Sequence, residues 1–221
     1  MKMLAIAAVV WGVLGGVAGA AEATLALDKW TYIQVDDARG KWGDWDEPGW
    51  LRYFGLDMAD VTGDGYKDLV AGRYFYRNPG GDMEGKWPRV DLGRNVDGML
   101  FVDVDGDDRG DVIATALPAV YWAEAKDRAG SGWTFTQIAT LPKTGHVNGQ
   151  GYATAQIEAG GRPEVLLAAE DGVYCLRIPE RPGEGEWPKV RIAAGVMDEG
   201  IGIGDLDGDG DVDIVCWQQH E

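Results

Sequence analysis

An acidic nonapeptide occurs three times in this chain. It reads DVTGDGYKD from Asp60, DVDGDDRGD from Asp103 and DLDGDGDVD from Asp205. Oxygen-bearing side chains at its first, third, fifth and ninth positions can converge on one hard cation, and a sixth residue that tolerates positive φ makes the tight turn. The pattern therefore predicts calcium-binding loops, with structural rather than regulatory ions.

Each loop offers four side-chain ligands and one backbone carbonyl. The expected ligands are Asp60, Thr62, Asp64, Tyr66 (carbonyl) and Asp68; Asp103, Asp105, Asp107, Arg109 (carbonyl) and Asp111; and Asp205, Asp207, Asp209, Asp211 (carbonyl) and Asp213. An EF-hand is excluded, because its twelfth residue is a bidentate Glu and the twelfth positions here hold Ala71, Ala114 and Cys216. An acidic turn without metal is the alternative for a single copy, and three copies in register favour the metal.

The charge of the chain narrows the class of partner. With 37 acidic and 20 basic residues, the formal net charge is −17. An excess of negative charge disfavours nucleic acid and anionic membranes as partners.

The first twenty residues have the pattern of a signal peptide. A basic Lys2 is followed by an apolar stretch and by the small residues Ala18 and Ala20, which suit signal peptidase. A retained membrane anchor is the alternative, but four glycines interrupt the stretch, which is short for a bilayer span. We expect cleavage near residue 20, a mature chain of residues 21–221, and a secreted, extracellular or periplasmic location.

The repeat extends beyond the acidic loops. A degenerate fourth copy runs from Gln156 to Glu164, so the loops start at 60, 103, 156 and 205, and no metal is expected in the degenerate one. A glycine lies five residues before every start, so the units begin near Gly55, Gly98, Gly151 and Gly200. The repeat spacings are therefore 43, 53 and 49 residues, and this period bears on the fold.

Each unit contains four predicted strands. A first strand enters the loop, an apolar second strand leaves it, an aromatic third strand follows, and a fourth begins at Trp87, Trp133 or Trp187 and then alternates. Period-two alternation is typical of an outer strand with one wet face. Four antiparallel strands in about 40 to 50 residues is the blade of an all-β propeller. Cys175 and Cys216 fall on strands of neighbouring units, which favours free thiols over a disulfide.

With its spaced acidic loop, preceding glycine and following apolar strand, the chain resembles the FG-GAP/VCBS-type repeat family, the calcium-loop propellers related to the integrin α-subunit head. The resemblance covers about residues 30–221 and implies a ring that usually has seven blades. Here the third unit lacks the ligands, and the fourth stops after its second strand. We expect a fragment of a larger ring; a closed four-bladed ring with one thin blade is the alternative.

Residues 30–36 match the tryptophan-led fourth strand but precede the first unit. They are therefore expected to be a closing strand that pairs with the last blade.

We expect a binding function on the face opposite the acidic loops, where two connections are unusual. One contains Arg39, Trp42, Trp45 and Trp50 among several carboxylates, and the other contains His146. Indoles stack on sugar rings and carboxylates accept hydroxyl hydrogen bonds, so these residues predict a ligand-binding surface for a glycan or an extracellular protein. The alternative is that the aromatic side chains pack within their own loop.

Catalysis has little support in the sequence. Ser131 lacks a nucleophile-elbow context, and the two histidines, His146 and His220, lack metal-ligand spacing. The sequence therefore favours a calcium-binding scaffold over an enzyme. A polysaccharide-degrading lyase or hydrolase, or its accessory domain, is the second hypothesis and depends on fold analogy alone.

Overall fold

The computed structural model describes residues 30–38, 53–107, 109–144, 148–195 and 199–216. The chain divides into two compact units, Met1–Tyr32 and Ile33–Glu221, and all described strands lie in the second. None of the described residues is helical, so that part of the chain contains no helix with the length and hydrophobicity of a membrane span.

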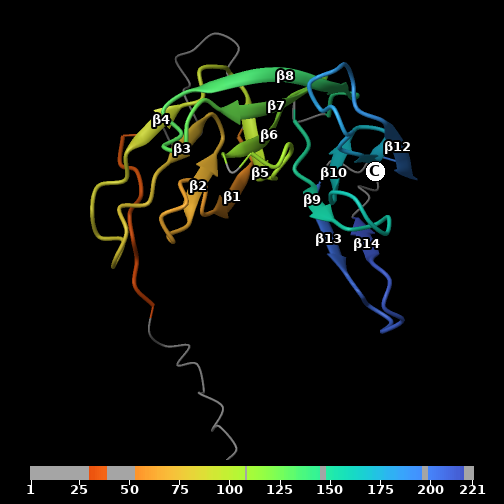
Figure 1. Ribbon diagram of the computed structural model, residues 1–221. Helices are drawn as coiled ribbons and strands as arrows, with labels where there is room; N and C mark the ends of the chain where they lie inside the picture. Colours follow the sequence, from red (N-terminus) through yellow and green to blue (C-terminus); the bar gives the residue numbers. More distant parts are fainter. Residues whose placement is uncertain (1–29, 39–52, 108, 145–147, 196–198, 217–221) are drawn as a thin grey trace, which may run out of the picture. The chain divides into compact units, whose positions relative to one another are not determined.

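Each repeat unit forms one antiparallel sheet (Figure 1). The first sheet contains β1 (Leu56–Ala59), β2 (Asp68–Ala71), β3 (Tyr74–Tyr76) and β4 (Arg89–Asp91). The second contains β5 (Asp97–Phe101), β6 (Asp111–Ala116), β7 (Ala119–Ala125) and β8 (Trp133–Thr140). The third contains β9 (Tyr152–Ala155), β10 (Glu164–Ala169), β11 (Gly172–Leu176) and β12 (Lys189–Ala194), and the last contains β13 (Ile201–Gly204) and β14 (Asp213–Cys216).

Strand order within every sheet follows the chain, and every neighbouring pair is antiparallel. The predicted blade-like repeats of an all-β chain are therefore confirmed. Because such strands alternate direction, the acidic loops between first and second strands lie at the same end of a sheet as the connections between third and fourth strands. This shared end positions the candidate site described below.

The sheets pack face to face in sequence order. One buried cluster joins the first sheet to the second and includes Val70, Phe75 and Trp133. A second cluster joins the second sheet to the third and includes Ile113 and Trp187, and a third joins Leu166 of the third sheet to the last one. Burial on both faces explains why the middle strands are nearly continuous apolar runs.

The glycines at the start of the first and third units are explained by a close backbone approach. A Cβ added to Gly55 would lie 2.0 Å from the carbonyl oxygen of Gly98, and one added to Gly151 would lie 2.1 Å from that of Glu199. In both cases the neighbour belongs to the start of the next unit. Gly200 differs, because no atom of the described residues lies within 4 Å of its added Cβ. Only a residue without a side chain fits where two inner strands meet this closely.

Residues 30–36 form no strand, which corrects the expected closing strand. Val35 instead packs against the outer face of the first sheet, beside Tyr74 and Tyr76. Asp36 accepts hydrogen bonds from the hydroxyl of Tyr76 at 2.9 Å and from Arg89 at 2.8 Å. Side-chain contacts, rather than backbone pairing, therefore hold Val35 and Asp36 to the first sheet.

Candidate metal loops and the adjoining cavities

The ninth-position acid has the same contact in all four loops. Asp68 accepts the backbone N–H groups of Val61 and Thr62 at 3.1 and 3.0 Å, and Asp111 accepts that of Val104 at 2.7 Å. In the third unit, Glu164 accepts the N–H of Ile157 at 2.8 Å, and in the last Asp213 accepts that of Leu206 at 2.8 Å. The acid at the start of the second strand thus secures the beginning of its loop. This contact also persists in the degenerate unit, where Glu replaces Asp.

The other loop carboxylates accept N–H groups inside their own turn. Asp60, Asp103 and Asp205, at the first position, accept from residues three to five positions later. Asp64, Asp107 and Asp209, at the fifth position, each accept the N–H two residues later at 2.9 Å. These Asx turns place several carboxylates on the inside of a tight loop.

Two of the three loops bring carboxylates close enough for one cation. Oxygen atoms of Asp103, Asp105 and Asp111 lie within 4.8 Å of one another, and so do those of Asp205, Asp207 and Asp209. Calcium takes oxygen ligands at about 2.3–2.6 Å, so ligands on opposite sides of an ion are about 5 Å apart. These residues are therefore close enough to hold one metal ion, with Asp111 as the most buried of them, and calcium as that ion stays a prediction.

The first loop is arranged differently. Its aspartates form no comparable group of three among the described residues. Asp68 is fully buried, and besides two loop N–H groups it accepts the N–H of Asn78 at 2.9 Å. Burial raises the pKa of Asp68, and these N–H donors oppose that increase. The structure thus uses Asp68 to join the loop to the connection between β3 and β4, and its role as a metal ligand stays a prediction.

Asp111 is the most perturbed acid of the three loops. Its side chain accepts the indole N–H of Trp122 at 2.7 Å as well as the N–H of Val104, and the residue is 2% exposed. Burial raises the pKa of Asp111 to about 7, and the charges of Asp105 and Asp107 add to the increase. Without a cation the second loop therefore holds a carboxyl group that is expensive to ionise.

Arg109 offsets part of the negative charge in the second loop. Its guanidinium pairs with Asp107 and, at 3.0 Å, with Glu124 of β7. Burial alone would raise the pKa of Asp107, but the hydrogen bonds from Arg109 lower it below its usual value. Arg109, expected as a carbonyl ligand, thus also contributes its side chain. Asp103, Asp105 and Asp111 are left as the group better suited to a metal.

Two cavities open at the end of the sheets that carries the acidic loops. A cavity of about 390 Å³ lies between the first two loops, lined by Asp60, Asp103 and Asp111 among others. A larger one, of about 480 Å³, lies beside the first loop and is lined by Arg77, Lys86 and Arg128. Arg128 lines both cavities.

The sequence predicts the ligand surface at the end of the sheets opposite the acidic loops. Arg39, Trp42, Trp45, Trp50 and His146 all lie outside the described residues, so that prediction stays a prediction. It overlooked the basic residues of the larger cavity. Strand order alone could have indicated them, because in antiparallel sheets the connections after third strands share an end with the acidic loops.

No protein-family model matches the chain, and no curated protein matches it. Among solved structures, a chain of the Photorhabdus luminescens Tc holotoxin pore is similar over 74% of this chain, with 16% identity and a TM-score of 0.35. The similar region spans 8% of that toxin chain. A similarity this weak supports no conclusion about fold or function.

Proposed function

We propose that this chain is an exported, calcium-stabilised β-propeller of the FG-GAP/VCBS type that serves as a binding scaffold for a glycan or an extracellular protein. The observation that carries the proposal is the contact between the ninth-position acid and the start of its loop, which recurs in four successive sheets. Such a ring is built from blades that each carry the same kind of acidic loop and that pack face to face in chain order.

Calcium would act on stability in this proposal. Extracellular calcium modules typically bind with dissociation constants of about 10⁻⁴ to 10⁻³ M. At about 1 mM calcium, each site would then stabilise the folded chain by roughly 0.4 to 1.4 kcal/mol. A few kcal/mol is a large fraction of the stability of an ordinary domain. The ion would also neutralise carboxylates that otherwise repel one another within a loop.

Removing calcium should lower the thermal stability of the protein. We expect the unfolding temperature, followed by circular dichroism, to fall by roughly 3 to 15 °C between 1 mM calcium and excess chelator. Asp207→Asn should reduce this difference, because Asp207 belongs to the carboxylate group of the last loop. Asp82→Asn is the matched control, since Asp82 is exposed and outside the loops. An unfolding temperature indifferent to chelator would contradict the calcium assignment.

Binding to glycans should depend on the predicted aromatic surface. On a panel of polysaccharides and glycan-bearing proteins, we expect retention by the native protein and roughly tenfold weaker retention after Trp42→Ala, Trp45→Ala or Trp50→Ala, because stacked rings dominate sugar contacts. Tyr66→Ala is the control, since Tyr66 is 43% exposed at the end of the sheets that carries the acidic loops. Release of new reducing or unsaturated sugar ends would instead support the polysaccharide-degrading alternative. No retention on any member of the panel would contradict the glycan part of the proposal.

A further inference from the structure

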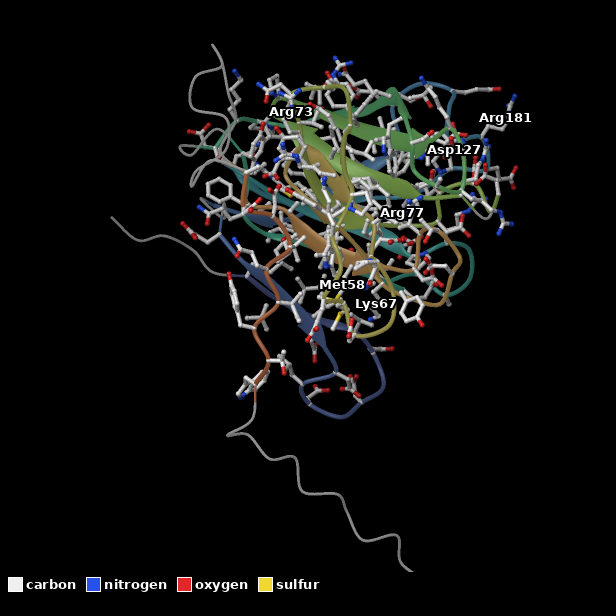
Figure 2. All side chains as sticks on the ribbon, turned by 90° about the vertical axis from the view of Figure 1, so that its left-hand side faces the viewer. Met58, Lys67, Arg73, Arg77, Asp127 and Arg181 are labelled. Carbon is white, nitrogen blue, oxygen red and sulfur yellow. The ribbon has the colours of Figure 1, made fainter. Side chains whose placement is uncertain are left out.

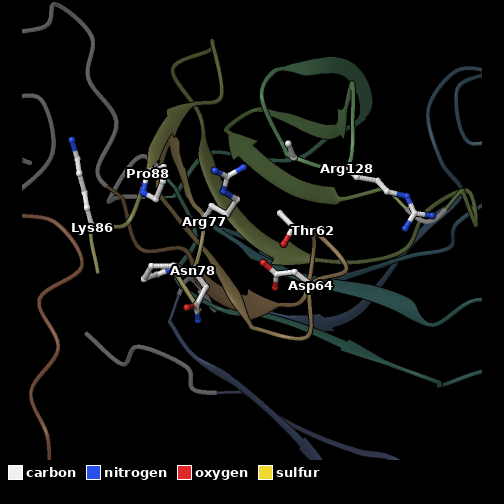
Figure 3. Close-up of a pocket in the computed structure, with 9 residues that line it drawn as sticks. Thr62, Asp64, Arg77, Asn78, Lys86, Pro88 and Arg128 are labelled. Atoms are coloured by element: carbon white, nitrogen blue, oxygen red, sulfur yellow. The ribbon is translucent and has the colours of Figure 1, made fainter. Parts of the chain in front are cut away.

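The larger cavity carries a charge opposite to that of the whole molecule. The chain has a net charge of −17. Yet this cavity is lined by three cationic side chains, Arg77, Lys86 and Arg128, and by one carboxylate, Asp64 (Figure 3). A cleft lined mainly by one sign of charge raises the local concentration of ligands of the opposite sign.

Arg77 is available to a ligand. It follows β3 directly, and its backbone N–H is bound to the carbonyl of Pro88 at 3.1 Å. Its side chain is exposed and makes no hydrogen bond or ion pair with the part of the chain that the structure describes. Arg73, which directly precedes β3, is instead paired with Asp91 at 2.7 Å. Figure 2 shows Arg77 near the middle of one face of the molecule.

The walls of the cavity are held in place by packing. Asn78 is buried, donates to the carbonyl of Lys67 at 2.8 Å and accepts the N–H of Gly80, which orders the chain beyond Arg77. On the other side, the turn that carries Arg128 rests on the first sheet, because a Cβ added to Gly130 would lie 2.5 Å from the ring of Phe75. The backbone next to Arg77 and Arg128 is therefore held in place by these contacts.

The loop side of the cavity adds polar groups. The Thr62 hydroxyl lines it, and this hydroxyl also interacts with the carboxylate of Asp68. The Asp64 carboxylate already accepts the N–H of Tyr66 at 2.9 Å, so part of its charge is engaged. The volume, about 480 Å³, lies in the range of about 300–1,000 Å³ that small-molecule sites occupy. Guanidinium groups pair with carboxylates and sulfates through two parallel hydrogen bonds.

We propose that this cavity binds the acidic group of an anionic saccharide, with Arg77 and Arg128 as the principal contacts and Lys86 at the rim. The choice of a saccharide rests on the proposed function, whereas the choice of an anion rests on the cavity itself. The site lies at the end of the sheets that carries the acidic loops, and it is distinct from the predicted tryptophan surface.

The test is calorimetric titration of the full chain with glucuronate oligosaccharides, neutral glucose oligosaccharides and inorganic sulfate. The buffer must lack chelators, because these are themselves polycarboxylates. We expect glucuronate to bind, glucose oligosaccharides not to bind, sulfate to bind more weakly, and the glucuronate affinity to fall as salt is raised. Arg77→Gln should weaken glucuronate binding about 10- to 100-fold, because a charge-assisted hydrogen bond is lost.

Arg181→Gln is the matched control, since it makes the same change of charge at an exposed arginine outside the cavity. Lys86→Gln is a second test at an exposed position, and unfolding curves show whether each variant folds. Unchanged glucuronate binding in Arg77→Gln, or equal binding of neutral oligosaccharides, overturns the site. Sulfate that binds as tightly as glucuronate overturns the saccharide assignment. Glucuronate binding to a protein that retains no glycan on the panel would contradict the proposed scaffold function and leave this site supported.

Discussion

Replacing Gly55 with alanine should destabilise the protein by about 3 kcal/mol, the upper end of the usual cost of overpacking. The added Cβ would lie 2.0 Å from the carbonyl oxygen of Gly98 and 2.8 Å from the Asp97 carboxylate. The two nearest atoms, the carbonyl oxygen and carbon of Gly98, are backbone atoms, so the closest contact cannot be relieved by rotating a side chain. The shift also disturbs the hydrogen bond from the Gly55 N–H to Asp97, which is 3.0 Å long and buried.

Urea unfolding followed by tryptophan fluorescence measures this effect, with an expected drop of about 6 to 12 °C in a parallel thermal scan. Gly200→Ala is the matched control at the same repeat position, because its added Cβ meets nothing within 4 Å. We expect that control to change the free energy of unfolding by less than about 1 kcal/mol. Equal losses in the two variants would show that the inner strands of the first two units do not meet as described.

Replacing Asp111 with alanine should cost about 3 to 5 kcal/mol in calcium-free buffer. The change leaves the indole N–H of Trp122 and the backbone N–H of Val104 without an acceptor, and each unsatisfied buried donor costs about 1–3 kcal/mol. Asp213→Ala is the matched control, since Asp213 has the equivalent contact with Leu206 but is only half-buried. If Asp111→Ala loses no more free energy of unfolding than Asp213→Ala, the burial of Asp111 described above is contradicted.

The carboxyl group of Asp111 should make the free energy of unfolding fall as pH rises. Its pKa is about 7 in the folded protein against an ordinary 3.8, so the folded state holds the proton more tightly than the unfolded state does. This contribution to stability is complete below about pH 4 and is lost as pH rises to about 7, by at most about 4 kcal/mol at roughly 1.4 kcal/mol per pKa unit. Urea unfolding of the native protein and of Asp111→Asn, at pH 5 and pH 8 without calcium, measures it. In Asp111→Asn, the free energy of unfolding should fall less between pH 5 and pH 8 than in the native protein. An equal fall in the two proteins would contradict the raised pKa of Asp111.

Much of the fold could be predicted from the sequence, because its signals are local and periodic. Apolar second strands, aromatic third strands and fourth strands near a tryptophan recur with the loops, and the structure has strands at these places. Only β8 begins at its tryptophan, whereas β4 and β12 begin two residues after Trp87 and Trp187. The glycine before each loop was recognised as a repeat position, but its cause was not. Only the structure shows that Gly55 and Gly151 contact the backbone of the following unit, since such contacts join residues more than 40 positions apart.

The candidate site, like the fold, could be predicted only in part from the sequence. Spacing alone marked the acidic loops, because every ligand of a loop lies within nine residues. Burial of Asp111 against Trp122, and the use of Asp68 to hold Asn78, depend on strand pairing and so could not be seen in the motif. The expected closing strand at residues 30–36 was wrong for a related reason, because strand formation needs a partner edge that sequence similarity does not supply.

By itself, the sequence determined the repeat, the all-β class and the acidic loops, which are all encoded in short segments. Only the tertiary structure decided which loop carboxylates converge and where cationic side chains gather. Arg77, Lys86 and Arg128 come from two sheets and line one cavity because the turn after β7 packs on Phe75 of β3. A site assembled from separate segments depends on packing between sheets, and that packing has no local signature in the chain.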